Sequence, residues 1–578
     1  MGQADQPLRE GLRASARGRQ GRPATARQEG SAASTLLLLG GPLAFLLLFF
    51  YYPLGSIMAA GVTDDAGRFS LTRLAGLLAD PYYLRIVGFT LGQALLSTLL
   101  SVALGLPGAY LMARFEFRAK GALRALTTIP FVLPSIIVVL GFVRFFGNNG
   151  ILNRFLMDLF GLAAPPLRIL YSFQAILLAH AFYNFPICIR MVSALWSRLD
   201  PRLEEAARSL GAHGPRLFLR VTLPQLLPGI LASAALIFLF CFMSFAVVLV
   251  LGGGPRFSTL EVEVYRLAKV SLDLQTGSAL AAVGASLSLL LLYGYIRLQQ
   301  RASFSEEPAP GTRGRRLSEL LNRPMGWLLL LYLALSFAVI LAPMLTVVLT
   351  SFQERSGWSA SAPSLAWYGR LFSLPGYRRA IANSLFFGAM TVALSLPLGT
   401  LLAVLSGRKR FPAARAFEAL AMLPLGVSSV VLGLGYLRAY RHFPWKIVGS
   451  WYAVVFAHTV IAYPFVIRAV SSVFNKIPPS LPEAARSLGA SSWQLFFHLE
   501  LPLIKPALIA AAAFAFGISV GEINATLMLV NPELITIPVA IYRLISSYNF
   551  IGACAMGTIL MLLCFFAFLA IDRAGRES

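Results

Sequence analysis

Apolar runs of roughly 20 residues, the length that a helix needs to cross the hydrocarbon of a bilayer, recur along the whole of this 578-residue chain. Hydrophobic residues make up 57% of the sequence and charged residues 13%. A soluble protein cannot bury that much apolar surface in one core, so lipid has to surround most of the chain. We therefore predict an all-α polytopic membrane protein with about twelve transmembrane helices. By hydropathy, the predicted spans cover residues 34–56, 86–113, 126–147, 170–192, 228–251, 278–297, 325–350, 381–406, 417–438, 449–470, 504–530 and 551–571.

The chain carries a net charge of +24, and the placement of its arginines indicates orientation in a membrane rather than binding to nucleic acid. Arginines collect in the N-terminal tail, between the two halves and in alternate loops, as the positive-inside rule expects. No basic stripe lies on a soluble region that would hold a duplex. An even number of spans places both termini in the cytoplasm. The short loop with Arg438, Arg441 and Lys446 is the main exception to this charge pattern.

Two polar stretches are near copies of each other, and both lie between hydrophobic segments. The first runs from Glu204 to Pro228 and the second from Pro482 to Pro506. The same register continues through the flanking spans, and a longer outer loop in the first half, residues 148–169, absorbs a change in spacing. Because each half holds an even number of spans, we predict two parallel six-helix repeats.

The repeat divides the chain into two membrane domains. Between them lies a stretch with Pro308, Pro310, Gly311 and several arginines but no apolar periodicity, which is typical of a flexible linker. In order, the predicted parts are a cytoplasmic Arg-rich tail (1–33), a first domain (34–298), a cytoplasmic linker (299–324), a second domain (325–572) and a cytoplasmic C-terminal tail (573–578).

Each polar copy is predicted to fold as a helix, a glycine turn and a second short helix on the cytoplasmic face. The first helix, from Pro201 to Leu210 and from Pro482 to Leu488, is rich in good helix formers, and the glutamates near its start favour the positive end of the helix dipole. Gly211 and Gly489 are natural stops in a left-handed conformation. The second helix is expected to end at a Leu-Pro pair. A mere connector would not need the same polar sequence twice, so we interpret the two copies as one partner surface used twice.

The pattern Glu-Ala-Ala, three residues, Gly, nine residues, then an aliphatic residue, any residue and Leu-Pro resembles the coupling motif of permease subunits of bacterial binding-protein-dependent ABC importers. Both copies match it, with Val221 and Leu499 standing where Ile is usual. The matching residues are Glu205, Ala206, Ala207, Gly211, Leu223 and Pro224 in the first copy, and Glu483, Ala484, Ala485, Gly489, Leu501 and Pro502 in the second.

This resemblance implies that the chain is the fused transmembrane subunit of such an importer in the bacterial inner membrane. It also implies that each copy docks as a coupling helix into a cleft on an ATP-binding subunit. The two motif glutamates would bond that subunit, and the two glycines would let the turn sit close to it.

The chain lacks the sequence G-x-x-x-x-G-K-[ST] that cradles ATP phosphates. We therefore expect a transport subunit that is not itself an enzyme and binds no cofactor, with ATP hydrolysed by partner subunits. The expected partners are two ATP-binding cassette subunits, a periplasmic substrate-binding protein and membrane lipid, with no nucleic acid.

Polar groups inside the predicted spans are candidates for the substrate pathway or its gate. Glu522 is the only carboxylate well inside a predicted span, Asn524 follows it closely, and the repeat partner of Glu522 is Ser244. One buried carboxylate suits a cationic substrate. Gate packing is the stronger interpretation, because similar Gly-Glu stretches also occur in permeases for anions.

His180 and His458 are paired by the repeat, and each lies beside aromatic residues and a proline that would bend its helix. We favour packing or hinge roles for them over a metal site. The four cysteines all fall in apolar segments and are expected to be small buried hydrophobes. No metal site is predicted.

The run from Leu251 to Arg266 and the stretch around His180 resemble the fused permeases of ferric-iron and thiamine importers. The expected substrate is ferric iron ahead of thiamine, with polyamines or anions behind. A rival from another class is an ion-coupled secondary transporter with repeated halves, but that predicts a relay of several intramembrane carboxylates or histidines, and this chain has essentially one carboxylate. A structural scaffold leaves the doubled polar motif unexplained.

Overall fold

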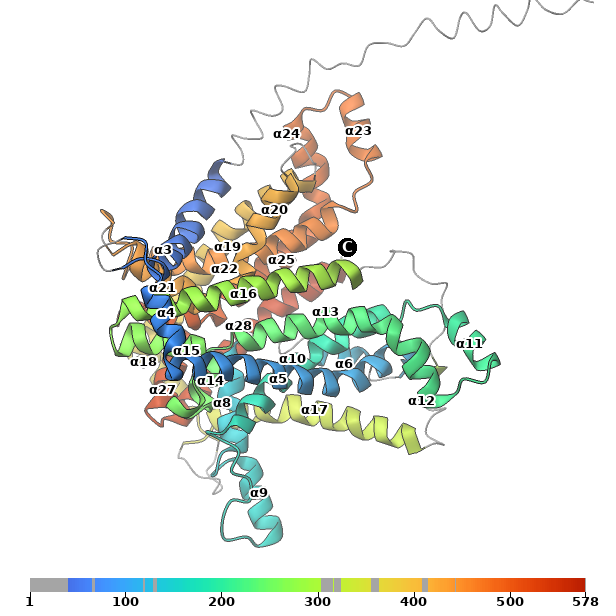
Figure 1. The fold of residues 1–578 in the computed structure, drawn as a ribbon, viewed down its shortest axis with the longest axis horizontal. Helices are drawn as coiled ribbons and strands as arrows, with labels where there is room; N and C mark the ends of the chain where they lie inside the picture. Colours follow the sequence, from blue (N-terminus) through green and yellow to red (C-terminus); the bar gives the residue numbers. More distant parts are fainter. Residues whose placement is uncertain are drawn as a thin grey trace, which may run out of the picture.

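The computed structural model of the chain describes residues 40–64, 68–117, 120–127, 133–302, 315–316, 324–354, 363–407, 414–441 and 443–576. The predicted N-terminal tail, most of the predicted linker and the last two residues lie outside these ranges. The described residues are helical almost throughout (Figure 1), and eleven helices among them are long and apolar enough to cross a membrane. The number is twelve if the bent pair Glu418–Gly426 and Ser429–Ala439 counts as one span, which agrees with the predicted fold class.

The first half begins with a span over Gly40–Gly61 that contains the π-helical turn η2 and the helix α3. The elements of this half are η2 (Leu47–Tyr51), α3 (Tyr52–Gly61), α4 (Thr72–Ala79), α5 (Pro81–Arg114), β1 (Phe115–Glu116), α6 (Lys120–Leu126), α8 (Ser135–Phe146), α9 (Ile151–Phe160), α10 (Phe173–Trp196), α11 (Pro201–Ser209), α12 (Gly214–Leu217), η3 (Phe218–Thr222), α13 (Leu223–Phe242), α14 (Ala246–Leu251), η4 (Pro255–Phe257), α15 (Leu260–Tyr265), η5 (Arg266–Val270) and α16 (Leu274–Ala302).

The second half follows the same order. Its elements are β2 (Arg315–Arg316), α17 (Pro324–Ser351), α18 (Ala366–Ser373), α19 (Pro375–Gly407), α20 (Ala414–Met422), η7 (Leu423–Gly426), α21 (Ser429–Ala439), α22 (Trp451–Phe474), α23 (Ser480–Ser487), α24 (Ser492–Gln494), η8 (Leu495–Glu500), α25 (Leu501–Gly521), α26 (Asn524–Leu529), α27 (Ile537–Ser546) and α28 (Phe550–Arg576).

The two halves match element by element, which confirms the predicted repeat. Helices α5, α8, α10, α13 and α16 correspond to α19, α21, α22, α25 and α28. Among the described helices between the first span and the last, α9 lacks a counterpart, and it occupies the outer loop that the sequence predicts to be longer in the first half.

The first span of each half packs against the opposite half. Helix α3 contacts α21 of the second half as well as α16 of its own, and α17 contacts α8 of the first half as well as α28 of its own. The hydroxyl of Tyr436 on α21 donates to the backbone carbonyl of Phe49, at 2.9 Å, and the Phe49 ring lies 4.1 Å from that of Phe456. The halves are therefore interlocked, although the sequence repeat separates them cleanly.

The third and ninth predicted spans are wrong as continuous helices. Helix α8 begins only at Ser135, directly after Pro134, and in the second half the chain bends by 101° ahead of α21. The backbone of Pro134 and of Ser428 is extended at these points. The Ser428 side chain accepts the N–H of Val430 at 3.2 Å and so satisfies one of the donors that a helix start leaves open.

The fifth and eleventh predicted spans are also interrupted. Helix α13 ends at Phe242 before α14 begins at Ala246, and α25 ends at Gly521 before α26 begins at Asn524. Ser244 and Glu522, which are repeat partners, therefore lie in helix breaks and not inside helices. Hydropathy misses both breaks because the apolar run continues through them.

Two short strands are the only ones among the described residues. Strand β1 pairs in parallel with β2, with Phe115 opposite Arg315 and Glu116 opposite Arg316. The pairing joins part of the predicted linker to the end of α5 and leaves the all-α class otherwise intact.

Glycines at equivalent positions allow a close helix crossing in each half. A Cβ added at Gly105 of α5 would lie 2.6 Å from the Cβ of Cys188 on α10, and one added at the equivalent Gly399 would lie 2.7 Å from the Cβ of Val466 on α22. Small residues at such crossings let helix backbones approach closely inside a membrane.

We expect Gly105→Val to destabilise the protein by about 1–3 kcal/mol, because the added side chain overpacks the α5–α10 crossing. Thermal denaturation in detergent, followed by loss of the monodisperse species, measures the effect. Gly92→Val on the same helix is the matched control, since a Cβ there meets no atom within 4 Å. Equal stability of the two variants would contradict the role of this crossing.

Candidate functional site

The first polar copy folds into a bent pair of helices, residues 200–222, that we call the first elbow. Asp200 caps α11, its side chain accepting the N–H of Arg202 at 2.9 Å. The helix ends at Gly211, whose φ is +83°, and the N–H of Ala212 donates to the carbonyl of Ala207 at 2.9 Å. The predicted arrangement of helix, left-handed glycine and helix is present.

The second polar copy, residues 479–500, has the same form, and we call it the second elbow. Gly489 has a φ of +89°, and the N–H of Ala490 donates to the carbonyl of Ala485 at 3.0 Å. Helix α24 then begins with a capping box between Ser491 and Gln494. Figure 1 shows both elbows at free ends of long helices, α11 and α12 beyond α5 and α13, and α23 and α24 beyond α19 and α25.

The Leu-Pro pairs do not end the second elbow helices, which corrects the sequence prediction. In both copies the helix continues into the span, over Gly214–Phe242 and Ser492–Gly521. A π-helical turn precedes each pair, so that the N–H of Leu223 donates to the carbonyl of Phe218. This wider turn relieves the clash between a proline ring and the carbonyl four residues earlier. Each elbow is thus continuous with a membrane-crossing helix.

The two elbows expose the same residues. Glu205 and Glu483 are exposed, and the motif positions that follow them have matching burial in the two copies. Leu210 and Leu488, one residue before each glycine, are 88% and 90% exposed. Because the same exposed leucine recurs in both copies, these two side chains are candidate contacts for a partner. The leucines were not predicted as site residues, although their recurrence in the Ser-Leu-Gly sequence was a signal.

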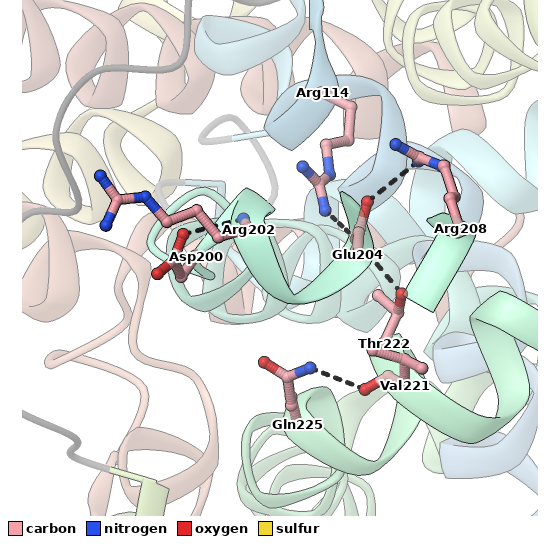
Figure 2. Close-up of polar contacts among 8 residues, drawn as sticks. All are labelled: Arg114, Asp200, Arg202, Glu204, Arg208, Val221, Thr222 and Gln225. Atoms are coloured by element: carbon pink, nitrogen blue, oxygen red, sulfur yellow. Dashed lines mark hydrogen bonds and ion pairs between the residues drawn. The ribbon is translucent and has the colours of Figure 1, made fainter. Parts of the chain in front are cut away.

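Polar contacts fix the base of the first elbow (Figure 2). The carboxylate of Glu204 pairs with Arg114 at the end of α5. Its second oxygen lies 3.3 Å from Arg208, and the hydroxyl of Thr222 donates to Glu204 at 3.2 Å. The Glu204 side chain is only 13% exposed, so it faces the protein while Glu205 faces water. The sequence indicated only that Glu204 suits a helix start.

The break at Glu522 is held by its own side chain. One carboxylate oxygen accepts the N–H of Ala525 at 2.8 Å and so caps α26. At the equivalent break in the first half, Gln93 of α5 donates to the carbonyl of Cys241 at 2.8 Å. These contacts satisfy backbone groups that an interrupted helix leaves open. Glu522 therefore stabilises the break, and its place in a gate stays a prediction.

Both paired histidines bond hydroxyl groups through both ring nitrogens. His180 lies 3.0 Å from Ser97 of α5 and 2.8 Å from Ser244 in the break. His458 lies 2.8 Å from Ser519 and 2.9 Å from Thr526, on either side of the second break. The geometry supports the predicted hinge or packing role. Among the described residues, no group of three or more His, Cys, Asp or Glu side chains is placed to hold a metal ion.

Two cavities lie where the halves meet. One of about 260 Å³ is lined by Ser135, His180 and Ser244 of the first half and by Asn524 of the second, whose buried Oδ1 has no hydrogen-bond partner. The other, of about 190 Å³, is lined by Ser135 and by Glu522. The structure thus brings four of the five pathway candidates to the boundary between the halves, and His458 lines neither cavity.

A second buried carboxylate lies at this boundary. Glu261 on α15 is 2% exposed, and the hydroxyl of Ser428 in the second half donates to it at 2.5 Å. Glu261 was not predicted as a site residue, because it lies between predicted spans, where carboxylates are common.

The comparisons with known proteins agree with this architecture. The family profile described as binding-protein-dependent transport system inner membrane component matches residues 105–303 and 395–576, once in each half. The thiamine transport system permease protein ThiP of Brucella abortus (strain 2308) is 29% identical over 527 residues, covering 90% of this chain and 92% of that protein.

Two further relatives cover most of the chain. ThiP of Escherichia coli (strain K12) is 30% identical over 504 residues, covering 86% of this chain and 89% of that protein. The putative ferric transport system permease protein FbpB 1 of Haemophilus influenzae (strain ATCC 51907 / DSM 11121 / KW20 / Rd) is 26% identical over 476 residues, covering 81% and 74%. The chain therefore belongs to the family of inner membrane components of binding-protein-dependent transport systems, as a fused ABC importer permease that carries the family's domain twice.

Proposed function

We propose that one ATP-binding subunit docks on each elbow, that a substrate-binding protein docks on the opposite face, and that substrate crosses between the halves of this chain. The matched pair of elbows carries the proposal. Each presents an exposed glutamate, a left-handed glycine and a leucine in water, at positions 278 residues apart. Two like surfaces suit two copies of one ATPase subunit, which also supplies the nucleotide site that this chain's sequence lacks.

The same proposal implies which side of the membrane the elbows and termini face and where the two membrane domains begin and end. With the elbows and both termini in the cytoplasm, the Arg-rich segments fall on that side, as the positive-inside rule expects. The two membrane domains, residues 34–298 and 325–572, would then be joined by a cytoplasmic linker at 299–324.

Passage of substrate requires the halves to move. The cavities of about 260 and 190 Å³ are smaller than the roughly 300–1,000 Å³ of small-molecule sites. The helix breaks at Ser244 and Glu522 border these cavities and lie at the ends of the spans that continue from the elbows. A shift of the elbows on ATP binding would therefore reach the walls of the pathway directly.

Thiamine is the substrate that we favour. It is a small heteroaromatic cation, and the larger cavity offers aromatic walls at Tyr183, Phe240 and Phe245 beside the polar groups of His180 and Asn524. Aromatic faces bind cations and stack on flat rings. The two ThiP relatives also cover more of this chain than the ferric relative does. This reverses the order expected from the sequence, and ferric iron becomes the second candidate because of the FbpB 1 relative.

In cells whose other thiamine uptake routes are deleted, we expect uptake of radiolabelled thiamine to depend on this chain and to fall to background in its absence. Ferric citrate in excess should not compete. Uptake of labelled ferric iron is measured in the same strains. Loss of iron uptake with unchanged thiamine uptake would assign the chain to ferric iron instead.

Replacing Glu205 and Glu483 together with lysine should abolish co-purification of the ATP-binding subunits, because both docking surfaces then carry the opposite charge. Membrane insertion should be unchanged, since both side chains are exposed. Affinity purification of tagged chain with quantification of the bound ATPase checks this. Unchanged association would exclude the elbows as the docking site.

Leu210→Asp combined with Leu488→Asp should also release the ATP-binding subunits, because a charge at each apolar tip opposes burial in a cleft. Thermal stability should stay within about 0.5 kcal/mol of the parent, as is usual for surface substitutions. Leu272→Asp is the control, since Leu272 is 76% exposed but lies outside both elbows. Retention of the ATPase by the double variant would show that the tips do not contact it.

A further inference from the structure

The two copies of the elbow sequence exchange the position of a carboxylate. Glu204 of the first copy corresponds to Pro482 of the second, and Thr222 corresponds to Glu500. Each copy therefore has one carboxylate at this place, but the carboxylate stands on a different helix of the elbow.

In the first copy these two positions are in contact. The Thr222 hydroxyl lies 3.2 Å from the Glu204 carboxylate, which also pairs with Arg114 and Arg208. Figure 2 shows the four side chains converging between the end of α5 and the two elbow helices. A carboxylate placed at position 222 would reach the same point from the other side.

The sequence of the second copy has the carboxylate at the exchanged position. Glu500 is 2% exposed, and a carboxylate so deeply buried has to be paired. By the repeat, Arg486 corresponds to Arg208 and Arg408 to Arg114; Arg408 lies outside the described residues. The carboxylate is therefore on the first helix of one elbow and on the second helix of the other, while both arginine positions are kept in the sequence.

We infer that the first elbow is tied to the preceding long helix by a carboxylate–arginine latch, in which Glu204 on the elbow pairs with Arg114 at the end of α5. The latch makes α5 move with the elbow. The inference rests on the proposed docking of ATP-binding subunits, because they supply the motion.

Contacts farther along α5 connect the latch to the helix break at Ser244. Gln93 of α5 bonds the carbonyl of Cys241 beside the first break. Ser97 of α5 bonds His180, which bonds Ser244 in that break. The elbow therefore reaches the break by two routes, through the continuous helix α12–α13 and through the latch and α5. Glu204 is a positioning residue on the second route, since its side chain faces away from the docking surface.

The test relocates the acid. Glu204→Ala removes the latch of the first elbow, and Glu204→Ala with Thr222→Glu restores a carboxylate in the arrangement of the second copy. Phe240→Cys is added to all variants as a reporter, because Phe240 is 42% exposed and lines the larger cavity. The rate of maleimide labelling at this cysteine is measured in the complex with the ATP-binding subunits, with and without ATP and vanadate. The four native cysteines are buried, and the chain without Phe240→Cys gives their background.

We expect ATP to change the labelling rate in the parent. Glu204→Ala should reduce that change by about fivefold or more, which is the lower end of coupling between linked sites. Adding Thr222→Glu should restore the change. Co-purification of the ATP-binding subunits should be unaffected in every variant. An undiminished ATP response in Glu204→Ala, or no restoration by Thr222→Glu, would overturn the latch.

The failure of the latch is distinguishable from failure of the proposed docking. Loss of co-purification in Glu204→Ala would show that this residue belongs to the docking surface, which also overturns the latch but leaves docking in place. Unchanged association after charge reversal at Glu205 and Glu483 would instead remove the docking itself.

Discussion

A helix that breaks inside a membrane exposes backbone N–H and C=O groups, and with no water in the hydrocarbon they must find partners within the protein. The polar residues of the spans are arranged around this requirement. Glu522 caps the helix that follows its own break, the amide of Gln93 donates to the carbonyl of Cys241 beside the other break, and Ser428 caps the helix after the sharp bend. Glu522, which the sequence offers as a pathway candidate, thus helps to make an interrupted helix possible, and it lines one of the cavities between the halves.

The sequence predicted the parts of this fold that depend on hydropathy and repetition. Span positions follow from the cost of placing charges in lipid, and the elbows follow from a polar motif that occurs twice. The breaks at Ser244 and Glu522 were missed because a change of a few backbone angles leaves the apolar run intact. The continuity of each elbow with its span was missed because proline usually ends a helix, and the π-helical turn that accommodates Pro224 has no sequence signature.

The exposed face of the elbows could be predicted from the sequence, but the contacts at their base and between the halves could not. The exposed face of the elbows is encoded in adjacent residues, so Glu205 and Gly211 were found directly. The pairing of Glu204 with Arg114 joins positions 90 residues apart, and the contact of Glu261 with Ser428 joins opposite halves. Such contacts depend on how the spans pack, which single-sequence patterns do not specify. The packing of the first span of each half against the opposite half could not be predicted for the same reason.

The pattern of what is repeated and what is not follows from the symmetry of the proposed partners. Two copies of one ATPase subunit present identical clefts, so the docking faces are held to one sequence, while the acid at the base of each elbow is free to change helix. The residues around the cavities do not match between the halves, and the repeat partner of Glu522 is Ser244. Helix Gly214–Phe242, with 29 residues, is about 43 Å long at 1.5 Å per residue. A helix of that length joins the repeated elbow to the break at Ser244, so a movement of the elbow would reach the residues around that break.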